Sequence, residues 1–402
     1  MKLPVYLDNS ATTPCDPLVA TAMLPYFTEH FGNPSSRHHL YGWEAEEAVD
    51  NARSHTAQLV GAKPSEIIFT GSATESCNLA LKGLVEGAGN SRQHIITLVT
   101  EHKAVLETLA QLERKGCEIT RIKVDRYGLP DPEEIERAIR PSTLLISMMY
   151  ANNETGVIMP VRDIAAMANK HGVLFFTDAT QAVGKIQVDV TVDGIDLMAF
   201  TAHKMYGPKG IAVLYIRNRN PRIRLTALLN GGYHERGIRS GTLNVPGIVG
   251  LGEASRLASD QMVQEGERLL AQRRNLEEAL LSLPGVHLNG HPQNRLPHIT
   301  NISIEQLESE QLLLHLSSRL ALGTGSACSS ATREPSHVLT AMGVSTGLLH
   351  CSLRISQGRF TTPEQENFAS DALGHAITVL RSVQSVDASI RRQPSSFSVL
   401  PE

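Results

Sequence analysis

Polar side chains follow short apolar runs at three places between residues 67 and 204. Asp178 comes directly after the run 173–177, Lys204 follows a second strand-like run, and the hydroxyl-rich sequence TGSATES of residues 70–76 follows a third. In α/β proteins the carboxyl ends of parallel strands share one edge, and ligands bind at that edge. We therefore expect these three features to belong to one site.

Each feature also has a simpler explanation when it is taken alone. Ser72 or Thr74 can serve only to start a helix, Asp178 can cap the helix after its strand, and a lone lysine is usually a solvated surface charge. The three features together fit pyridoxal phosphate, which needs a carboxylate for its pyridine nitrogen, an amine for a Schiff base and an anion cradle. In this interpretation Asp178 keeps the ring nitrogen protonated, while a desolvated Lys204 acts as nucleophile and then as base.

A further reactive group, Cys328, lies within the run GTGSACSS of residues 323–330. A cysteine that serves packing normally has large apolar neighbours, and Cys328 has almost none. Its surroundings therefore indicate a role other than packing.

These groups must be positioned by an α/β fold. Between residues 60 and 215, β-branched runs alternate with amphipathic stretches, which predicts βαβ units and a mostly parallel sheet. The expected strands are residues 67–69, 94–99, 144–148, 173–177 and 212–216. From about Ser259 the pattern becomes one long helix, followed by a mixture of strands and helices that includes an expected strand at 298–304. We therefore expect a large cofactor-binding domain of residues 15–258 and a smaller α+β domain of residues 1–14 and 259–402.

Composition limits the partners and the location of the protein. The chain of 402 residues has a net charge of -4, so it lacks the excess of positive charge that binding to nucleic acid or to an anionic membrane requires. Its five cysteines have no CxxC spacing, so we expect neither a disulfide framework nor a bound metal. The sequence contains no signal-peptide core and no membrane-spanning apolar run, and a cytoplasmic protein with small-molecule or protein partners is expected.

Ten motifs follow one another between residues 6 and 361. They read YLDNSATTP, GNPSSR, FTGSATES, TEHKAV, NNETG, DATQAVGK, AHKMYGPKG, GGYHERGIRSGT, GSACSSATREPSHVL and LRISQGRFT. With this ordered set the chain resembles the NifS/IscS-type cysteine desulfurases of the class V aminotransferase family. The resemblance implies a fold-type I pyridoxal-phosphate enzyme: a large domain with a mainly parallel seven-stranded sheet, a smaller α+β domain, and a homodimer.

The resemblance also implies a role for each matching residue. Lys204 would bind the cofactor, His102 would stack on its ring and handle substrate protons, and Cys328 would be the nucleophile. Arg354, together with Asn153, would bind the substrate, because a guanidinium fits a carboxylate with two hydrogen bonds. Taken singly, His102 could equally be a satisfied polar residue and Arg354 a surface ion pair. The residues expected around the cofactor are Ala73, Thr74, His102, Asn153, Asp178, Gln181, Thr201, His203, Lys204 and, reaching the cofactor of the other subunit, Thr242.

The implied reaction converts L-cysteine to L-alanine and leaves the sulfur as a persulfide on Cys328, within a loop at about residues 323–335. A sulfur-acceptor protein, either an iron–sulfur scaffold or a thiolation enzyme, is the expected partner. The C-terminal segment 391–402 has no recognisable docking tail, so delivery to iron–sulfur assembly, tRNA thiolation or DNA phosphorothioation stays open. Cys77 stands where family members often have aspartate, and we expect it only to pack.

Three alternative functions stay open. A selenocysteine lyase would use nearly the same chemistry. An aminotransferase or lyase for another small amino acid would have no use for Cys328. A scaffold that holds the cofactor without catalysis is disfavoured because Lys204, His102 and Cys328 are all present.

Overall fold

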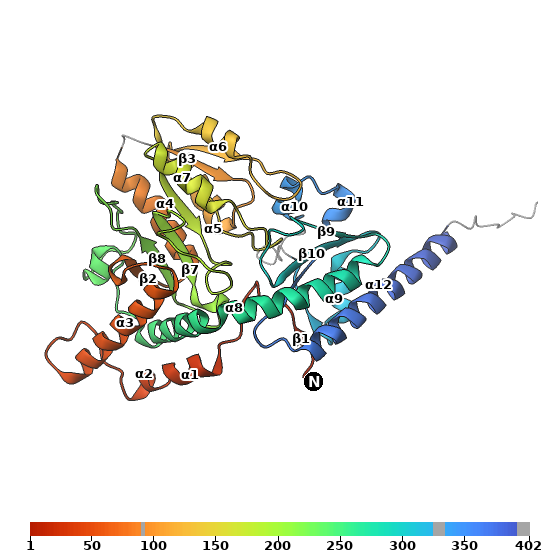
Figure 1. Cartoon of the computed structure of the whole chain (residues 1–402), viewed down its shortest axis with the longest axis horizontal. Coiled ribbons are helices and arrows are strands. Elements are labelled where there is room, and N and C mark those ends of the chain that lie inside the picture. Colours follow the sequence, from red (N-terminus) through yellow and green to blue (C-terminus); the bar gives the residue numbers. More distant parts are fainter. Residues whose placement is uncertain (90–92, 325–333, 392–402) are drawn as a thin grey trace, which may run out of the picture.

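The largest sheet of the molecule has seven strands, and all but one of them point the same way. The computed structural model describes residues 1–89, 93–324 and 334–391 (Figure 1). The strand order is β2 (Ile67–Thr70), β8 (Ala212–Ile216), β7 (Leu197–Thr201), β6 (Leu174–Asp178), β5 (Thr143–Ser147), β3 (His94–Leu98) and β4 (Glu118–Ile122). Only β8 within this sheet runs antiparallel to its neighbours. The predicted mostly parallel seven-stranded sheet is confirmed.

Apart from the edge strand β4, the strands of this sheet are mostly apolar because both of its faces are covered. Successive side chains enter different cores: Phe175 packs into one and Phe176 into the other. The connecting elements are η1 (Pro64–Glu66), α4 (Ala73–Ala88), α5 (Lys103–Arg114), α6 (Pro132–Ala138), α7 (Val161–Lys170), η2 (Ala202–Lys204) and η3 (His234–Gly237). The sequence prediction missed β4, in which Glu118 and Arg121 are exposed, and it gave no bounds for β7, the strand-like run before Lys204.

A second group of strands lies beside the first, at the right of Figure 1. β12 (Ser352–Ser356), β10 (Ile299–Ile304) and β9 (Val286–Leu288) form an antiparallel sheet, and β1 (Val5–Tyr6) pairs with β11 (Leu320–Ala321). The helices here are α9 (Ser309–Leu316), α10 (His337–Ala341), α11 (Thr346–Leu349) and α12 (Pro363–Arg391). The N-terminal residues Val5 and Leu7 share a buried cluster with Ile302, Leu353 and Leu373, so the chain start packs against segments near its end.

One long helix, α8 (Val245–Leu281), runs between the two groups of strands (Figure 1). It begins well before Ser259, where the sequence pattern predicts its start, because its first turns carry glycines in place of a polar face. A Cβ on Gly252 would lie 2.5 Å from the Cα of Ala52, so this glycine lets α8 pack closely on α3 (Leu40–Leu59). The division of the chain into domains at residue 259 stays a prediction.

The remaining helices, α1 (Pro17–Met23) and α2 (Pro25–Thr28), lie next to α3 and α8. Among the described residues there is no helix with the length and apolar character that a membrane crossing requires.

Candidate active site

A pocket of about 370 Å³ opens at the edge of the large sheet where its parallel strands end. Asp178 is the last residue of β6 and Thr201 the last residue of β7, while α4 and α5 begin at the same edge. This is the position at which α/β sheets bind ligands. The lining residues are Ser10, Ala11, Ser72, Ala73, Thr74, His102, Ala104, Met149, Ala151, Asn153, Asp178, Thr180, Gln181, Thr201, His203, Lys204 and Arg354.

The pocket brings together almost all of the residues that the sequence singled out. Every residue expected around the cofactor or the substrate lines it, except Thr242. Thr242 is exposed in the loop before α8 and does not reach the pocket of its own chain. Cys328 lies outside the described residues.

The amine of Lys204 is held by main-chain oxygens from the start of the chain. Its Nζ donates to the carbonyl oxygen of Ala11 at 2.7 Å and to the carbonyl oxygen of Ser10. The Ser10 carbonyl also accepts a hydrogen bond from Gln181 Nε2 at 3.0 Å. Sequence reasoning missed Ser10 and Ala11 as site residues, although both lie in the motif YLDNSATTP that carried the resemblance.

The buried carboxylate of Asp178 is fixed from two sides. Its Oδ1 accepts from the backbone N–H of Thr180 at 3.0 Å, and the sulfur of Cys77 lies 3.9 Å from its Oδ2. Burial raises the pKa of the Cys77 thiol well above its ordinary value, which keeps the thiol protonated. Cys77 thus packs against the carboxylate as a neutral S–H group.

The start of α4 is both a capped helix end and a wall of the pocket. Ser72 Oγ accepts from the N–H of Glu75 at 3.1 Å, as the simple capping interpretation expects. The Glu75 carboxylate accepts from the N–H of Gly71 at 2.8 Å and from Arg239 Nε at 2.9 Å. Ser72 and its two successors line the pocket, so the helix N-terminus is available to an anion.

His102 and Arg354 are anchored in different ways at the pocket wall. His102 caps α5, and its Nδ1 accepts from the N–H of Ala104 at 3.1 Å, so Nε2 carries the proton of the neutral ring. The guanidinium of Arg354 on β12 is buried; Nη2 pairs with Asp8 Oδ1 at 2.7 Å, and Nη1 donates to the Asn153 carbonyl at 3.0 Å. Arg354 therefore forms a buried ion pair with Asp8, and the alternative that it forms an ion pair at the surface is wrong.

His203, the neighbour of Lys204, stays uncharged at neutral pH. Burial and the nearby charges of Lys204 and Lys209 lower its pKa to about 4. Its Nδ1 lies 3.1 Å from Thr12 Oγ1, and its carbonyl accepts from Thr13 Oγ1 at 3.0 Å.

The donor set of the pocket fits pyridoxal phosphate. It combines the carboxylate of Asp178, the amine of Lys204 and the N-terminus of α4. Ser10 Oγ and Thr180 Oγ1, which also belong to the lining residues, are buried hydroxyls without a hydrogen-bond partner in the part of the chain that the structure describes. Buried hydroxyls usually have partners, and the oxygens of a phosphorylated ring can supply them.

The family model of the class-V aminotransferases matches residues 5–366. The chain belongs to the aminotransferase class-V family. Within it, the chain is 50% identical over 383 residues to the cysteine desulfurase IscS of Methylococcus capsulatus, covering 95% of this chain and 94% of that protein. It is likewise 50% identical over 385 residues to the IscS of Photorhabdus laumondii, covering 95% of each.

Solved structures agree with this family. A NifS-like protein with 36% identity superposes with a TM-score of 0.87, over 94% of this chain and 100% of that one. SspA in complex with cysteine gives a TM-score of 0.77 at 36% identity, over 87% and 98% of the two chains. The predicted resemblance to the cysteine desulfurases and the fold type are confirmed. Because this family depends on pyridoxal phosphate, the predicted cofactor is confirmed as well.

The lowered pKa of His203 predicts a loss of stability in acid. The unfolded chain binds a proton at this side chain below about pH 6.5, whereas the folded chain does so only near pH 4, so stability falls as the pH drops through this window. In cofactor-free protein, the urea midpoint should therefore fall less between pH 7 and pH 5 for His203→Gln than for wild type. In His38→Gln, which removes an exposed histidine, the urea midpoint should fall between pH 7 and pH 5 by as much as in wild type. An equal fall in the urea midpoint for wild type and His203→Gln would contradict the lowered pKa of His203.

Proposed function

We propose that the chain is a cysteine desulfurase, which converts L-cysteine to L-alanine and takes up the sulfur as a persulfide on Cys328. The observation that carries this proposal is the arrangement of Lys204, Asp178, His102 and Arg354 around one pocket. The 50% identity to IscS cysteine desulfurases over nearly the whole chain supports the same activity.

Pyridoxal phosphate, when bound, supplies the electron sink that makes the Cα proton of an amino acid removable. Lys204 would hold the cofactor covalently at rest and would then accept the Cα proton of the substrate. The carbonyls of Ser10 and Ala11 orient its amine, since both accept hydrogen bonds from Nζ. Asp178, at the end of β6, would keep a proton on the pyridine nitrogen, and the neutral Cys77 beside it adds no competing charge.

The elements that meet at the sheet edge would hold the phosphate and the ring. The N-terminus of α4 at Ala73 and Thr74 would bind the phosphate together with Thr201 and His203. Thr242 would contribute from the partner chain. His102 would stack on the ring and move substrate protons, while Gln181 and Asn153 would approach the phenolic oxygen.

The substrate carboxylate binds to Arg354, whose planar guanidinium offers two parallel N–H groups. Asp8 and the Asn153 carbonyl hold this guanidinium before substrate arrives, so little orientational freedom remains to be lost on binding.

The sulfur step takes place between two sulfur atoms. The Cys328 thiolate donates an electron pair to the substrate sulfur, a new S–S bond forms, and the bond between Cβ and sulfur breaks. The electron pair of the broken bond stays on the carbon side and is protonated there, which yields alanine. The persulfide on Cys328 then passes its outer sulfur to an acceptor protein, an iron–sulfur scaffold or a thiolation enzyme, within the cytoplasm.

The enzyme acts as a homodimer in this proposal. Large apolar side chains that are at least 50% exposed are concentrated on α1, α2, the start of α3 and the segment between them: Leu18, Leu24, Phe27, Phe31, Leu40, Tyr41 and Trp43. A patch of this kind marks an interface with another protein. Thr242 lies exposed and away from the pocket of its own chain, which supports a role at the site of a partner chain.

Replacement of the nucleophile tests the activity. Cys328→Ser should bind cysteine and keep the colour of the cofactor, but alanine release should fall by orders of magnitude because a hydroxyl at this position cannot take the sulfur. Alanine and sulfide are measured together after addition of cysteine. The control Cys15→Ser, which changes an exposed cysteine, should release alanine at the wild-type rate. Wild-type release from Cys328→Ser would overturn the proposed mechanism.

Mixed dimers test whether each site uses both chains. Lys204→Ala and Thr242→Ala chains are purified separately, unfolded together and refolded. A hybrid dimer would contain one doubly altered site and one site with Lys204 and Thr242 both intact, so the mixture should regain activity that neither variant has alone. If the mixture shows only the average of the two variants, Thr242 does not serve the partner's site.

A further inference from the structure

A residue in the left-handed backbone region lies two positions after Lys204. Tyr206 has a backbone φ of 65°, in the left-handed region, although it carries a large and completely buried side chain. This conformation costs an L-residue about 1–2 kcal/mol and persists only where the surroundings enforce it.

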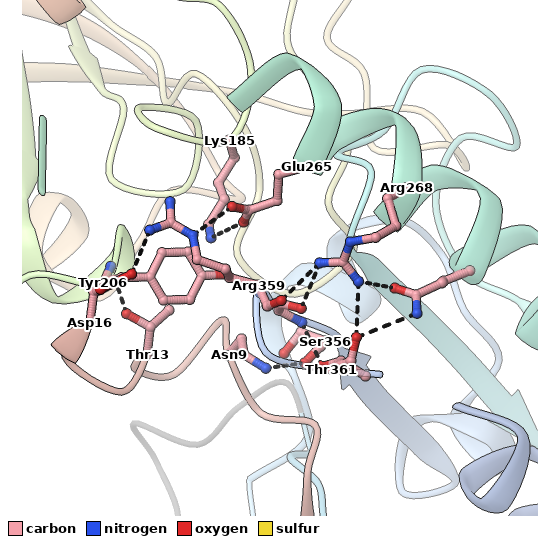
Figure 2. Close-up of polar contacts among 12 residues, drawn as sticks. Asn9, Thr13, Asp16, Lys185, Tyr206, Glu265, Arg268, Ser356, Arg359 and Thr361 are labelled. Atoms are coloured by element: carbon pink, nitrogen blue, oxygen red, sulfur yellow. Dashed lines mark hydrogen bonds and ion pairs between the residues drawn. The ribbon is translucent and has the colours of Figure 1, made fainter. Parts of the chain in front are cut away.

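Every polar atom of Tyr206 is engaged by another segment (Figure 2). Its N–H donates to Thr13 Oγ1 at 2.9 Å, and its carbonyl accepts from the N–H of Asp16 at 2.9 Å. Its hydroxyl oxygen accepts from the backbone N–H of Arg359 at 2.6 Å. The residue is thus fixed by the N-terminal segment and by the segment that follows β12.

Two positively charged side chains lie against the ring of Tyr206. Lys185 Nζ lies 3.9 Å and the guanidinium carbon of Arg359 4.3 Å from the ring centroid. Glu265 on α8 joins these cations, with Arg359 Nε at 2.8 Å and Lys185 Nζ at 3.7 Å (Figure 2). Asp16 accepts from Arg359 Nη1 at 2.9 Å, so two cations and two anions form a balanced buried group.

This buried group is made of Asp16, Lys185, Tyr206, Glu265 and Arg359, and its ion pairs by themselves are a weak source of stability, because the desolvation of buried ions roughly cancels their attraction. The two cation–π contacts add about 0.5–2 kcal/mol each, and both require the Tyr206 ring to stay between Lys185 and Arg359. The interactions of the group therefore favour one position of the Tyr206 ring and, with it, the strained backbone at this residue.

This buried group is connected both to the segment that contains Lys204 and to the strand that contains Arg354. Thr13 Oγ1 donates to the carbonyl of His203 and accepts from the N–H of Tyr206. One hydroxyl group therefore holds the backbone on both sides of Lys204. On the other side, Arg359 follows the strand that carries Arg354. Arg268 of α8 secures this segment, because its Nη2 donates to the Arg359 carbonyl at 3.0 Å and its Nη1 to the Thr361 carbonyl at 2.9 Å (Figure 2).

We propose that Tyr206 is a positioning residue: held in its strained conformation by Lys185, Glu265 and Arg359, it aims Lys204 into the pocket and fixes it relative to Arg354. This inference rests on the proposed function, because it concerns the covalent reaction of Lys204 with pyridoxal phosphate. Tyr206 touches neither substrate nor cofactor and acts through the backbone of residues 203–206.

The test compares two buried tyrosines. Tyr206→Leu removes the ring that the cations hold, and Tyr215→Leu removes an equally buried tyrosine of β8 that does not line the pocket. Full-length protein is freed of cofactor, mixed with pyridoxal phosphate, reduced with borohydride at set times, and the labelled peptide with Lys204 is quantified. We expect labelling of Tyr206→Leu to be about 10- to 100-fold slower than that of wild type, the penalty for a misplaced reacting group. Tyr215→Leu should label at the wild-type rate, although its urea midpoint also falls.

Two further variants keep the test decisive if Tyr206→Leu does not fold. Tyr206→Phe keeps the ring between its cations and should label within a few-fold of wild type. Arg359→Lys keeps the positive charge but cannot bind Glu265 and Asp16 together, so its labelling should slow down as in Tyr206→Leu.

The outcomes separate this inference from the proposed function. Equal labelling rates in wild type, Tyr206→Leu and Arg359→Lys, or equal slowing by Tyr215→Leu, would show that Tyr206 serves the core only and would overturn the inference. If wild type itself formed no borohydride-stable bond at Lys204, the proposed function would fail first, and the inference with it.

Discussion

A primary amine inside a pocket needs oxygen partners, and in this chain the carbonyl groups of Ser10 and Ala11 supply them. The rest of the site depends on this contact, because it requires the N-terminal segment to lie across the carboxyl edge of the large sheet. The same segment then reaches the substrate side: Asn9 Nδ2 donates to the Ser356 carbonyl, and Asp8 pairs with Arg354. Six consecutive residues, 8–13, thereby connect Lys204, which is proposed to hold the cofactor, with Arg354, which is proposed to bind the substrate carboxylate.

The large sheet has a complementary task. Its parallel strands end together, so residues far apart in the sequence, such as Asp178 and Thr201, reach one pocket without long loops. Buried polar groups under the pocket are held by short local contacts, for example the N–H of Thr180 on the Asp178 carboxylate. Asp178, Thr201 and Arg354 thus lie on strands, which position side chains more accurately than loops do, whereas the N-terminal segment owes its position to its hydrogen bonds.

Apolar periodicity was sufficient to predict five strands of the large sheet within about a residue, because strands buried on both faces carry continuous apolar runs. It failed for the edge strand β4, whose charged residues face solvent, and for the start of α8, where glycines replace the expected polar face. The two domains and the roles of individual residues stay predictions.

The position of polar residues after apolar runs predicted that Asp178, Lys204 and residues 70–76 form one site, and the motifs predicted the remaining site residues. The residues that were missed are of two kinds. Ser10 and Ala11 act through main-chain carbonyls, which every residue possesses, so nothing in the side chains distinguishes them. Tyr206 acts through a partner more than a hundred residues away in the sequence, and only the folded chain brings the two together. Side-chain chemistry can be inferred from a sequence, whereas support from a distant segment requires the topology.

In the proposed reaction, sulfur leaves cysteine and arrives on one thiol of this chain. Mass spectrometry of the intact and digested protein after cysteine treatment, without reductant, measures this directly. We expect one added sulfur atom on the peptide that contains Cys328, and none on the peptides that contain Cys15, Cys77, Cys117 or Cys351. Added sulfur on any of those four cysteines, or alanine formation with no sulfur retained on Cys328, would contradict it.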